Sequence, residues 1–310
     1  MLEKLSKYQN LAYEIYGKDT WRQKRRAILF WPRAYKNAEQ MEGTQHFFDH
    51  YIARPCMLRD HLYLYEVINR VFFFKDSKAS ERYAMLINHF TELANSFTPE
   101  AIALFYEKSE TDGITLYHNE ELALNVQLCF QAAHRKEGLL SIFIYYKGEK
   151  SGNINFCFHK DGEGKRAIFV GTFQGPVPGS GVDIKELTKK MFGYRPKNFT
   201  IFCLRELANT LGIERIYAVS DEGFYSQSHM LRGNRTKFAE FNPFWEELGG
   251  EKSSLHPMYY KIPVEEPRKT YDTMKTHKRN LYRKRYELLD SVMESFQMAL
   301  QPYLQEEKKK

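Results

Sequence analysis

The stretch QGPVPGSGVDIKELTKKMFGYRPK, residues 174–197, contains the residue types that bind phosphate. Glycines let backbone N–H groups approach an anion closely, and a helix start directs free N–H groups and a positive dipole end toward it. We expect helix starts near Asp183 and Pro196. The sequence therefore predicts a site for phosphate or pyrophosphate, formed by Gln174, Gly175, Gly179, Gly181, Arg195 and Lys197. The alternative is a glycine-rich crossover in which Asp183 is an ordinary N-cap residue.

Three residues with acid–base chemistry follow a strand that we expect to end at Ser220. They are Asp221, Glu222 and His229. A carboxylate or imidazole at this position could take a proton from a substrate. The plainer interpretation is that each is a polar loop residue.

Other catalytic and metal-binding patterns are absent from the sequence. H-E-x-x-H, C-x-x-C, G-x-S-x-G and G-x-x-x-x-G-K-[ST] do not occur, and the ten histidines are dispersed. GEGKR, residues 162–166, lies between two expected strands, where a hairpin turn explains it. The four cysteines are widely spaced, which favours reduced, packed side chains. We therefore expect no metal site.

The chain divides by pattern into three regions, and the glycine-rich stretch lies in the middle one. Residues 1–112 are mostly helical, because apolar residues recur at helical spacing. Residues 113–266 begin with four strand candidates: ELALNVQLCFQAA, LLSIFIYYKG, GNINFCFHKD and RAIFVGTFQG. Helix, helix, strand, short helix and strand follow. Residues 267–310 contain a basic helix, expected from about Asp272 to Tyr303, and a tail. The predicted fold is α+β, with a mixed, mostly antiparallel sheet.

The net charge of +7 is concentrated near the C-terminus. Residues 268–286 contain one acid, Asp272, and eight cations: Arg268, Lys269, Lys275, Lys278, Arg279, Arg283, Lys284 and Arg285. This surplus of positive charge fits an anionic membrane surface. It fits a nucleic acid less well, because no known nucleic-acid-binding motif is recognisable in the sequence. The apolar stripe along the same helix fits packing on the protein's own core better than insertion into lipid; it consists of Leu281, Leu288, Leu289, Val292, Phe296 and Leu300.

A second segment combines cations with tryptophans: WRQKRRAILFWP, residues 21–32. Here too we favour packing inside the protein over a membrane interface.

The sequence shows neither a membrane-spanning segment nor a leader peptide, and this predicts the cellular location. No run of about 18 apolar residues occurs, and MLEKLSKYQNLAYEIYG has no cleavable leader pattern. We expect a cytoplasmic protein, with peripheral binding to the inner membrane as an alternative.

The segment after the phosphate-binding stretch resembles a known fold. NFTIFCLRELANTLGIERIYAVSD resembles the central helix and fifth strand of the GNAT superfamily of N-acyltransferases, and NPFWEELGGEKSSLHPMYYKIPV resembles its closing helix and strand. The resemblance implies that two strands part, here after Phe173, and that a donor's pantetheine and pyrophosphate lie in the gap over the central helix. The chain departs from that family in placing an extra helix after the glycines. It also has Trp245 where many members have a tyrosine acting as general acid.

A longer series of motifs resembles the VirK/YbjX family. It runs from Lys136-Glu137-Gly138 through Gln174-Gly175-Pro176 and Phe244-Trp245-Glu246-Glu247-Leu248-Gly249-Gly250 to the late Tyr282-Arg283-Lys284-Arg285-Tyr286. The resemblance implies a bacterial protein linked to envelope integrity and resistance to cationic peptides, and it supplies no reaction. Members commonly have a histidine soon after Ala-Val-Ser, whereas His229 lies further along.

Two functional hypotheses follow from these patterns. The first is an acyl or aminoacyl transferase that uses acyl-CoA, an acyl carrier protein or aminoacyl-tRNA as donor and acts on an envelope-related, small-molecule or peptide acceptor. The second is a non-catalytic protein that binds the membrane through residues 268–286 and supports envelope integrity and cationic-peptide resistance.

Overall fold

The N-terminal third of the protein is helical, as the periodicity predicts. The computed structural model describes residues 2–106, 113–176, 179–227, 240–270, 272 and 274–306. The helices of this region are α1 (Leu2–Tyr16), α2 (Trp21–Lys36), α3 (Ala38–Asp49), α4 (Met57–Asp60), α5 (Leu64–Asn69), α6 (Ala79–Ser96) and α7 (Pro99–Phe105). Thr98 caps α7 by accepting a hydrogen bond from Ala101 N, with Pro99 in the first helical position.

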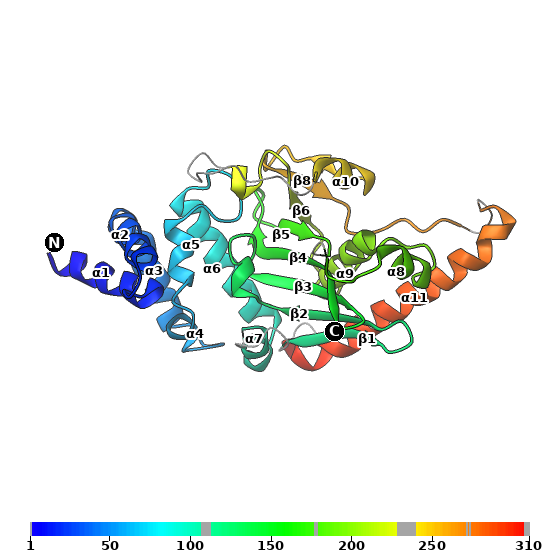
Figure 1. The fold of residues 1–310 in the computed structure, drawn as a ribbon, viewed down its shortest axis with the longest axis horizontal. Coiled ribbons are helices and arrows are strands. Elements are labelled where there is room, and N and C mark those ends of the chain that lie inside the picture. The colour runs from blue at the N-terminus through cyan, green and yellow to red at the C-terminus, as the bar shows by residue number, and fades with distance from the viewer. Residues whose placement is uncertain are drawn as a thin grey trace.

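The middle of the described chain forms one sheet of eight strands (Figure 1). They are β1 (Ile114–Asn119), β2 (Leu124–Cys129), β3 (Leu140–Tyr146), β4 (Glu149–Lys160), β5 (Arg166–Gln174), β6 (Ile216–Val219), β7 (Glu251–Lys252) and β8 (Tyr259–Ile262). Their spatial order is β1-β2-β3-β4-β5-β6-β8-β7. Among these strands β5 and β6 are parallel, and the other neighbours are antiparallel. The predicted mixed, mostly antiparallel α+β fold is confirmed.

The antiparallel meander has one strand more than the sequence predicts. β1 precedes the expected set, and a bulge between Thr115 and Tyr117 breaks the alternation that would have indicated it. The turn between β3 and β4 has the conformation that its glycine predicts. Lys147 and Gly148 both have positive φ, as a two-residue hairpin loop requires. The 162–166 segment is likewise a turn, between β4 and β5.

The remaining helices follow β5 in the sequence, and the last of them runs back along β1 toward α7 (Figure 1). They are α8 (Ile184–Lys190), α9 (Pro196–Thr210), α10 (Asn242–Glu247) and α11 (Thr276–Leu300). Asp183 caps α8, because its Oδ1 accepts from the N–H groups of Lys185 and Glu186 at 2.8 and 3.1 Å. α9 packs on β3 and β4.

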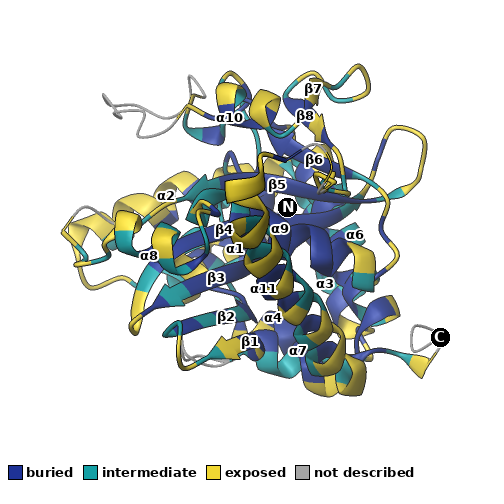
Figure 2. Ribbon diagram, turned by 90° about the vertical axis from the view of Figure 1, so that its right-hand side faces the viewer, coloured by how far each residue is buried: buried dark blue, intermediate teal, exposed yellow. Residues whose placement is uncertain are grey.

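The long helix α11 packs its apolar stripe inside the protein. It buries Leu288, Leu289, Val292, Phe296 and Leu300, and it contacts β1 and α9. Leu281, nearer the basic end, is 40% exposed. Figure 2 shows the strands of the sheet as mostly buried and the outer side of α11 as exposed. The stripe is therefore used for internal packing.

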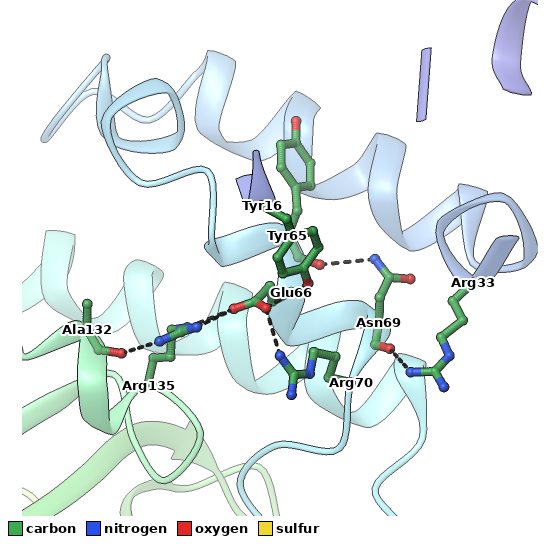
Figure 3. Close-up of polar contacts among 8 residues, drawn as sticks. All are labelled: Tyr16, Arg33, Tyr65, Glu66, Asn69, Arg70, Ala132 and Arg135. Atoms are coloured by element: carbon green, nitrogen blue, oxygen red, sulfur yellow. Dashed lines mark hydrogen bonds and ion pairs between the residues drawn. The ribbon is translucent and has the colours of Figure 1, made fainter. Parts of the chain in front are cut away.

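A buried carboxylate ties the N-terminal helices to the loop before β3. Glu66 of α5 is 1% exposed; it accepts from Tyr16 Oη at 2.6 Å and pairs with Arg70 at 2.9 Å and Arg135 at 2.7 Å (Figure 3). Burial alone would raise the pKa of Glu66, but Arg135, Tyr16 and Arg70 outweigh it and hold that pKa below its ordinary value. The helical region and the sheet share one hydrophobic core.

Candidate functional site

The parallel strands β5 and β6 separate before β5 ends. Their pairing runs from Ile168 opposite Ile216 to Val170 opposite Ala218, whereas β5 continues to Gln174. We expected the separation after Phe173, and the pairing ends earlier, at Val170. The ring of Phe244 from α10 lies beside that of Phe173, with centroids 5.4 Å apart. The last residues of β5 therefore border a gap with an aromatic wall.

A pocket of about 770 Å³ opens at this end of β5. Phe173, Gly175 and Pro176 form one side, α8 forms a second, and the first turn of α9 forms a third. Its lining is largely apolar, with four cations around it: Lys185, Lys189, Arg195 and Lys197. This size and composition are typical of sites for organic ligands that carry a charged group.

The start of α9 offers unsatisfied backbone donors to the pocket. Arg195 is the N-cap residue and makes no side-chain capping bond, and Pro196 has no N–H group. The first intrahelical bond is donated by Phe199 N to Arg195 O at 3.0 Å. The N–H groups of Lys197 and Asn198 therefore point outward at the positive end of the helix dipole. Lys197 lines the pocket, so an anion there would lie close to this helix start.

Glu247 of α10 pairs with the two cations at this helix start. It forms an ion pair with Arg195 and a second with Lys197 at 3.1 Å. The Lys197 ammonium also lies 4.4 Å from the centre of the Phe244 ring. Partial burial, together with the charge of Arg195, lowers the pKa of Lys197. A bound phosphate would compete with Glu247 for these cations.

The structure brings some of the predicted phosphate-binding residues together and leaves others apart. Gly175, Arg195 and Lys197 line the pocket. Gly179 and Gly181 are exposed with φ of 84° and 76°, and neither is among the described lining residues. Gln174 points to the opposite face of β5, where its Nε2 lies 3.5 Å from Glu137 Oε2.

The predicted acid–base residues lie at the start of α10. Asp221 accepts from the N–H groups of Phe241 and Asn242 at 2.8 and 3.3 Å. Glu222 accepts from Asn242 Nδ2 at 3.1 Å, a bond that lowers the pKa of Glu222. Neither carboxylate is among the described residues that line the pocket. His229 lies outside the described residues.

A polar cluster that the sequence reasoning missed lies on the other face of β4 and β5. We define it as His134, Glu137, Asn153, Asn155 and Gln174. Glu137 Oε2 accepts from Asn155 Nδ2 at 3.2 Å and lies 3.2 Å from His134 Nδ1. Neither polar atom of the fully buried Asn153 side chain has a hydrogen-bond partner among the described residues. The sequence signal that could have revealed this cluster is the pair Asn153 and Asn155 inside an expected strand, because buried polar side chains are normally hydrogen-bonded.

The backbone of Glu137 rests directly on β5 at the point where β6 departs. A Cβ built on Gly171 would overlap the carbonyl oxygen of Glu137. Gly171 directly follows Val170, the last β5 residue paired with β6. The pocket and the polar cluster therefore lie on opposite faces of β5, next to the same gap.

Within the described residues, no group of three or more His, Cys, Asp or Glu side chains could hold a metal ion. None of the described helices is long and apolar enough to cross a bilayer.

The open mixed sheet, with a basic pocket beside its parallel pair, defines an α+β protein, and sequence comparison places it in a family. The family model described as "Protein of unknown function (DUF535)" matches residues 19–298, and the chain belongs to this family. It is similar to "Uncharacterized protein YbjX" of Escherichia coli (strain K12), with 28% identity over 209 residues, which are 66% of this chain and 62% of that protein. An uncharacterized protein of Haemophilus influenzae is 24% identical over 262 residues, 84% of each chain. The resemblance to the VirK/YbjX family is confirmed.

Proposed function

We propose that the protein is an acyl or aminoacyl transferase whose donor phosphate binds at the start of α9. The pocket between the end of β5, α8 and the first turn of α9 carries this proposal. It combines an apolar volume for an acyl or pantetheine chain with cations and free N–H groups for a phosphate. CoA thioesters, acyl carrier proteins and aminoacyl-tRNA all present a phosphate near the group that they transfer.

The topology supports a GNAT-like arrangement of this site. An antiparallel meander leads into β5, α9 connects β5 to the parallel strand β6, and α10 and the β7–β8 pair follow. This is the order of elements that the sequence resemblance implies. The extra helix α8 does not close the gap, since Ile184, Lys185, Thr188 and Lys189 from it line the pocket. Its presence is thus compatible with a bound donor.

The polar cluster is the proposed acceptor side. An amine or hydroxyl of the acceptor attacks the donor's carbonyl carbon, the bond from that carbon to the thiol or ribose oxygen breaks, and the leaving group departs as thiol or alcohol. Glu137 takes the acceptor proton, which passes to the leaving group. We assign this role to Glu137 because Asp221 and Glu222 hold the start of α10 with their oxygens. An envelope component, a small molecule or a peptide with a free amine or hydroxyl would serve as acceptor.

Calorimetric titration of the full chain with CoA, acyl carrier protein and aminoacyl-tRNA tests the donor site. The double variant Arg195→Ala/Lys197→Ala should weaken the donor that binds by about tenfold or more, because it removes two charge-assisted contacts. The matched control is Lys252→Ala/Lys261→Ala, which removes two exposed lysines of β7 and β8. Wild-type protein that binds none of the three donors, or equal affinities of the double variant and wild type, would contradict the proposal.

Glu137 is tested separately, once a donor is known. Glu137→Gln should leave donor affinity unchanged and lower the rate of acyl transfer by about 10²-fold or more. If Asp221→Asn lowers the transfer rate by about 10²-fold and Glu137→Gln does not lower it, Glu137 is not the base and the base lies in the segment after β6.

A further inference from the structure

The outer face of α2 is exposed although the helix is firmly held. Thr20 and Gln23 form a capping box at its start, and Ala27, Phe30 and Ala34 are buried on its inner side. Trp21, Ile28 and Tyr35 are spaced seven residues apart, so they share one stripe on the outer side. With Leu29 beside them they form what we name the outer ridge, whose exposed fractions are 75% for Trp21, 51% for Ile28, 49% for Leu29 and 39% for Tyr35. Exposed aromatic and aliphatic side chains grouped this way indicate a binding surface.

Cations flank the outer ridge, and α2 itself has no acid to balance them. α2 contains no acidic residue and six exposed cations: Arg22, Lys24, Arg25, Arg26, Arg33 and Lys36. None of the six makes an ion pair with any residue that the structure describes. The partner of this face must therefore accept apolar side chains and supply negative charge.

A small pocket opens beside the outer ridge. Its volume is about 190 Å³, and Arg26, Arg33 and Arg70 line it together with Leu29 and Phe30. Arg33 and Arg70 are drawn in Figure 3, where Arg33 reaches the carbonyl oxygen of Asn69 and Arg70 reaches Glu66. Such a volume has room for a phosphate headgroup. Guanidinium groups are well suited to bind one.

We infer that the outer face of α2 docks on a bilayer surface rich in anionic phospholipid. The outer ridge enters the interface between headgroups and acyl chains, the flanking cations lie among the headgroups, and the arginine pocket takes one phosphate. A second copy of the chain does not fit, since a symmetric contact would bring the same cations together. A nucleic acid would match the charges but would leave Ile28 and Leu29 without an apolar partner.

This inference does not depend on the transferase. It also moves the membrane contact away from residues 268–286, because the apolar stripe that continues along the same helix, from Leu288 to Leu300, is buried in the protein's own core, and of the six stripe residues only Leu281 is exposed.

Sedimentation with sucrose-loaded vesicles tests the docking surface in the full chain. We expect binding to phosphatidylcholine vesicles that contain phosphatidylglycerol, little binding to pure phosphatidylcholine, and weaker binding when NaCl rises from about 0.1 M to about 0.5 M. The variant Arg22→Gln/Lys24→Gln/Arg25→Gln should lower the partition coefficient by about 10- to 100-fold. Ile28→Ser, at an exposed position, should lower it by several-fold while the salt dependence persists.

The matched control removes the same charge from the other basic helix. Lys278→Gln/Arg279→Gln/Arg283→Gln should keep the partition coefficient within about twofold of wild type. Binding should also shift the tryptophan fluorescence to shorter wavelength, and Trp21→Phe should abolish that shift. The inference is wrong if anionic vesicles do not bind, if the α11 variant loses binding as the α2 variant does, or if duplex DNA or RNA binds and vesicles do not.

Discussion

The indole Nε1 of Trp245 donates a hydrogen bond of 2.9 Å to the carbonyl oxygen of Val219, the last residue of β6. This bond turns the end of β6 toward α10 while β5 continues on to Gln174. Trp245, which the sequence resemblance aligns with a catalytic tyrosine, thus has a structural role here: its indole N–H ties α10 to the end of β6.

Replacing Trp245 should therefore destabilise the protein. Trp245→Phe leaves the buried Val219 carbonyl without its donor, and we expect a loss of about 1–3 kcal/mol in the free energy of unfolding. Urea denaturation followed by circular dichroism measures it. Trp31→Phe, at a half-buried position, should cost less than about 1 kcal/mol and is the control. Equal unfolding free energies of Trp245→Phe and wild type would show that the bond does not hold β6 in place.

Gly171 is predicted to be intolerant of any side chain. A Cβ there would overlap the Glu137 carbonyl oxygen, so Gly171→Ala must push the loop before β3 off the sheet, at a cost of about 1–3 kcal/mol or more. Gly175→Ala, four residues further along, is the control, because nothing lies within 4 Å of its added Cβ. Thermal unfolding of the two variants compares them. A melting temperature as low for Gly175→Ala as for Gly171→Ala would contradict the packing argument.

The ion pairs of Glu247 predict that its removal favours phosphate binding. Glu247→Gln frees Arg195 and Lys197, which are both partly exposed, so the gain should be modest, about 2- to 5-fold in donor affinity. Calorimetry with the donor that binds measures the change. Glu246→Gln, whose carboxylate instead accepts from Tyr260 Oη, should leave donor affinity unchanged. Weaker binding by Glu247→Gln would mean that Glu247 contacts the ligand rather than competing with it.

The buried imidazole of His89 should make the free energy of unfolding depend on pH. Its Nδ1 accepts from Phe158 N at 3.1 Å, and its Nε2 donates to Tyr106 Oη at 2.9 Å, since that hydroxyl itself donates to Leu139 O. Burial lowers the pKa of His89 to about 3, against 6.5 for an ordinary histidine. The unfolded chain therefore binds a proton that the folded protein excludes, and stability falls as pH drops below 6.5 toward 3.

The size of this effect is set by one proton. His89 contributes a slope of up to about 1.4 kcal/mol per pH unit in that window. His159, whose pKa burial lowers to about 4, adds a loss of the same sign. His89→Gln should flatten the dependence of the unfolding free energy between about pH 7 and about pH 5.5, measured by urea denaturation. Parallel curves for the variant and the wild type would contradict the assignment.

Features that are determined by a few neighbouring residues, such as turns, caps and helix starts, could be predicted from the sequence. The Lys147-Gly148 turn, the Asp183 cap and the start of α9 at Pro196 each follow from a few neighbouring residues, and the phosphate-binding prediction rested on such signals. The strand β1 was missed because a bulge interrupts its alternation.

What remained hidden from the sequence depends on contacts between distant segments. Asp221 caps a helix that begins twenty-one residues later, at Asn242, so its bonds are invisible in its own loop. The polar cluster needs the loop before β3 to lie over Gly171, which only the folded sheet brings about. The exposed side of α2 likewise becomes evident only when the packing of its inner side is known.

Hydrogen exchange followed by mass spectrometry tests the central claim most directly, namely that the gap beside β5 and the start of α9 hold a donor phosphate. With CoA, acyl carrier protein or aminoacyl-tRNA in saturating amounts, we predict slower exchange in peptides covering residues 171–176 and 195–200, which contain the end of β5 and the start of α9 that line the pocket. This protection should disappear in Arg195→Ala/Lys197→Ala. Unchanged exchange in both peptides with every donor, or protection confined to other segments, would contradict the account.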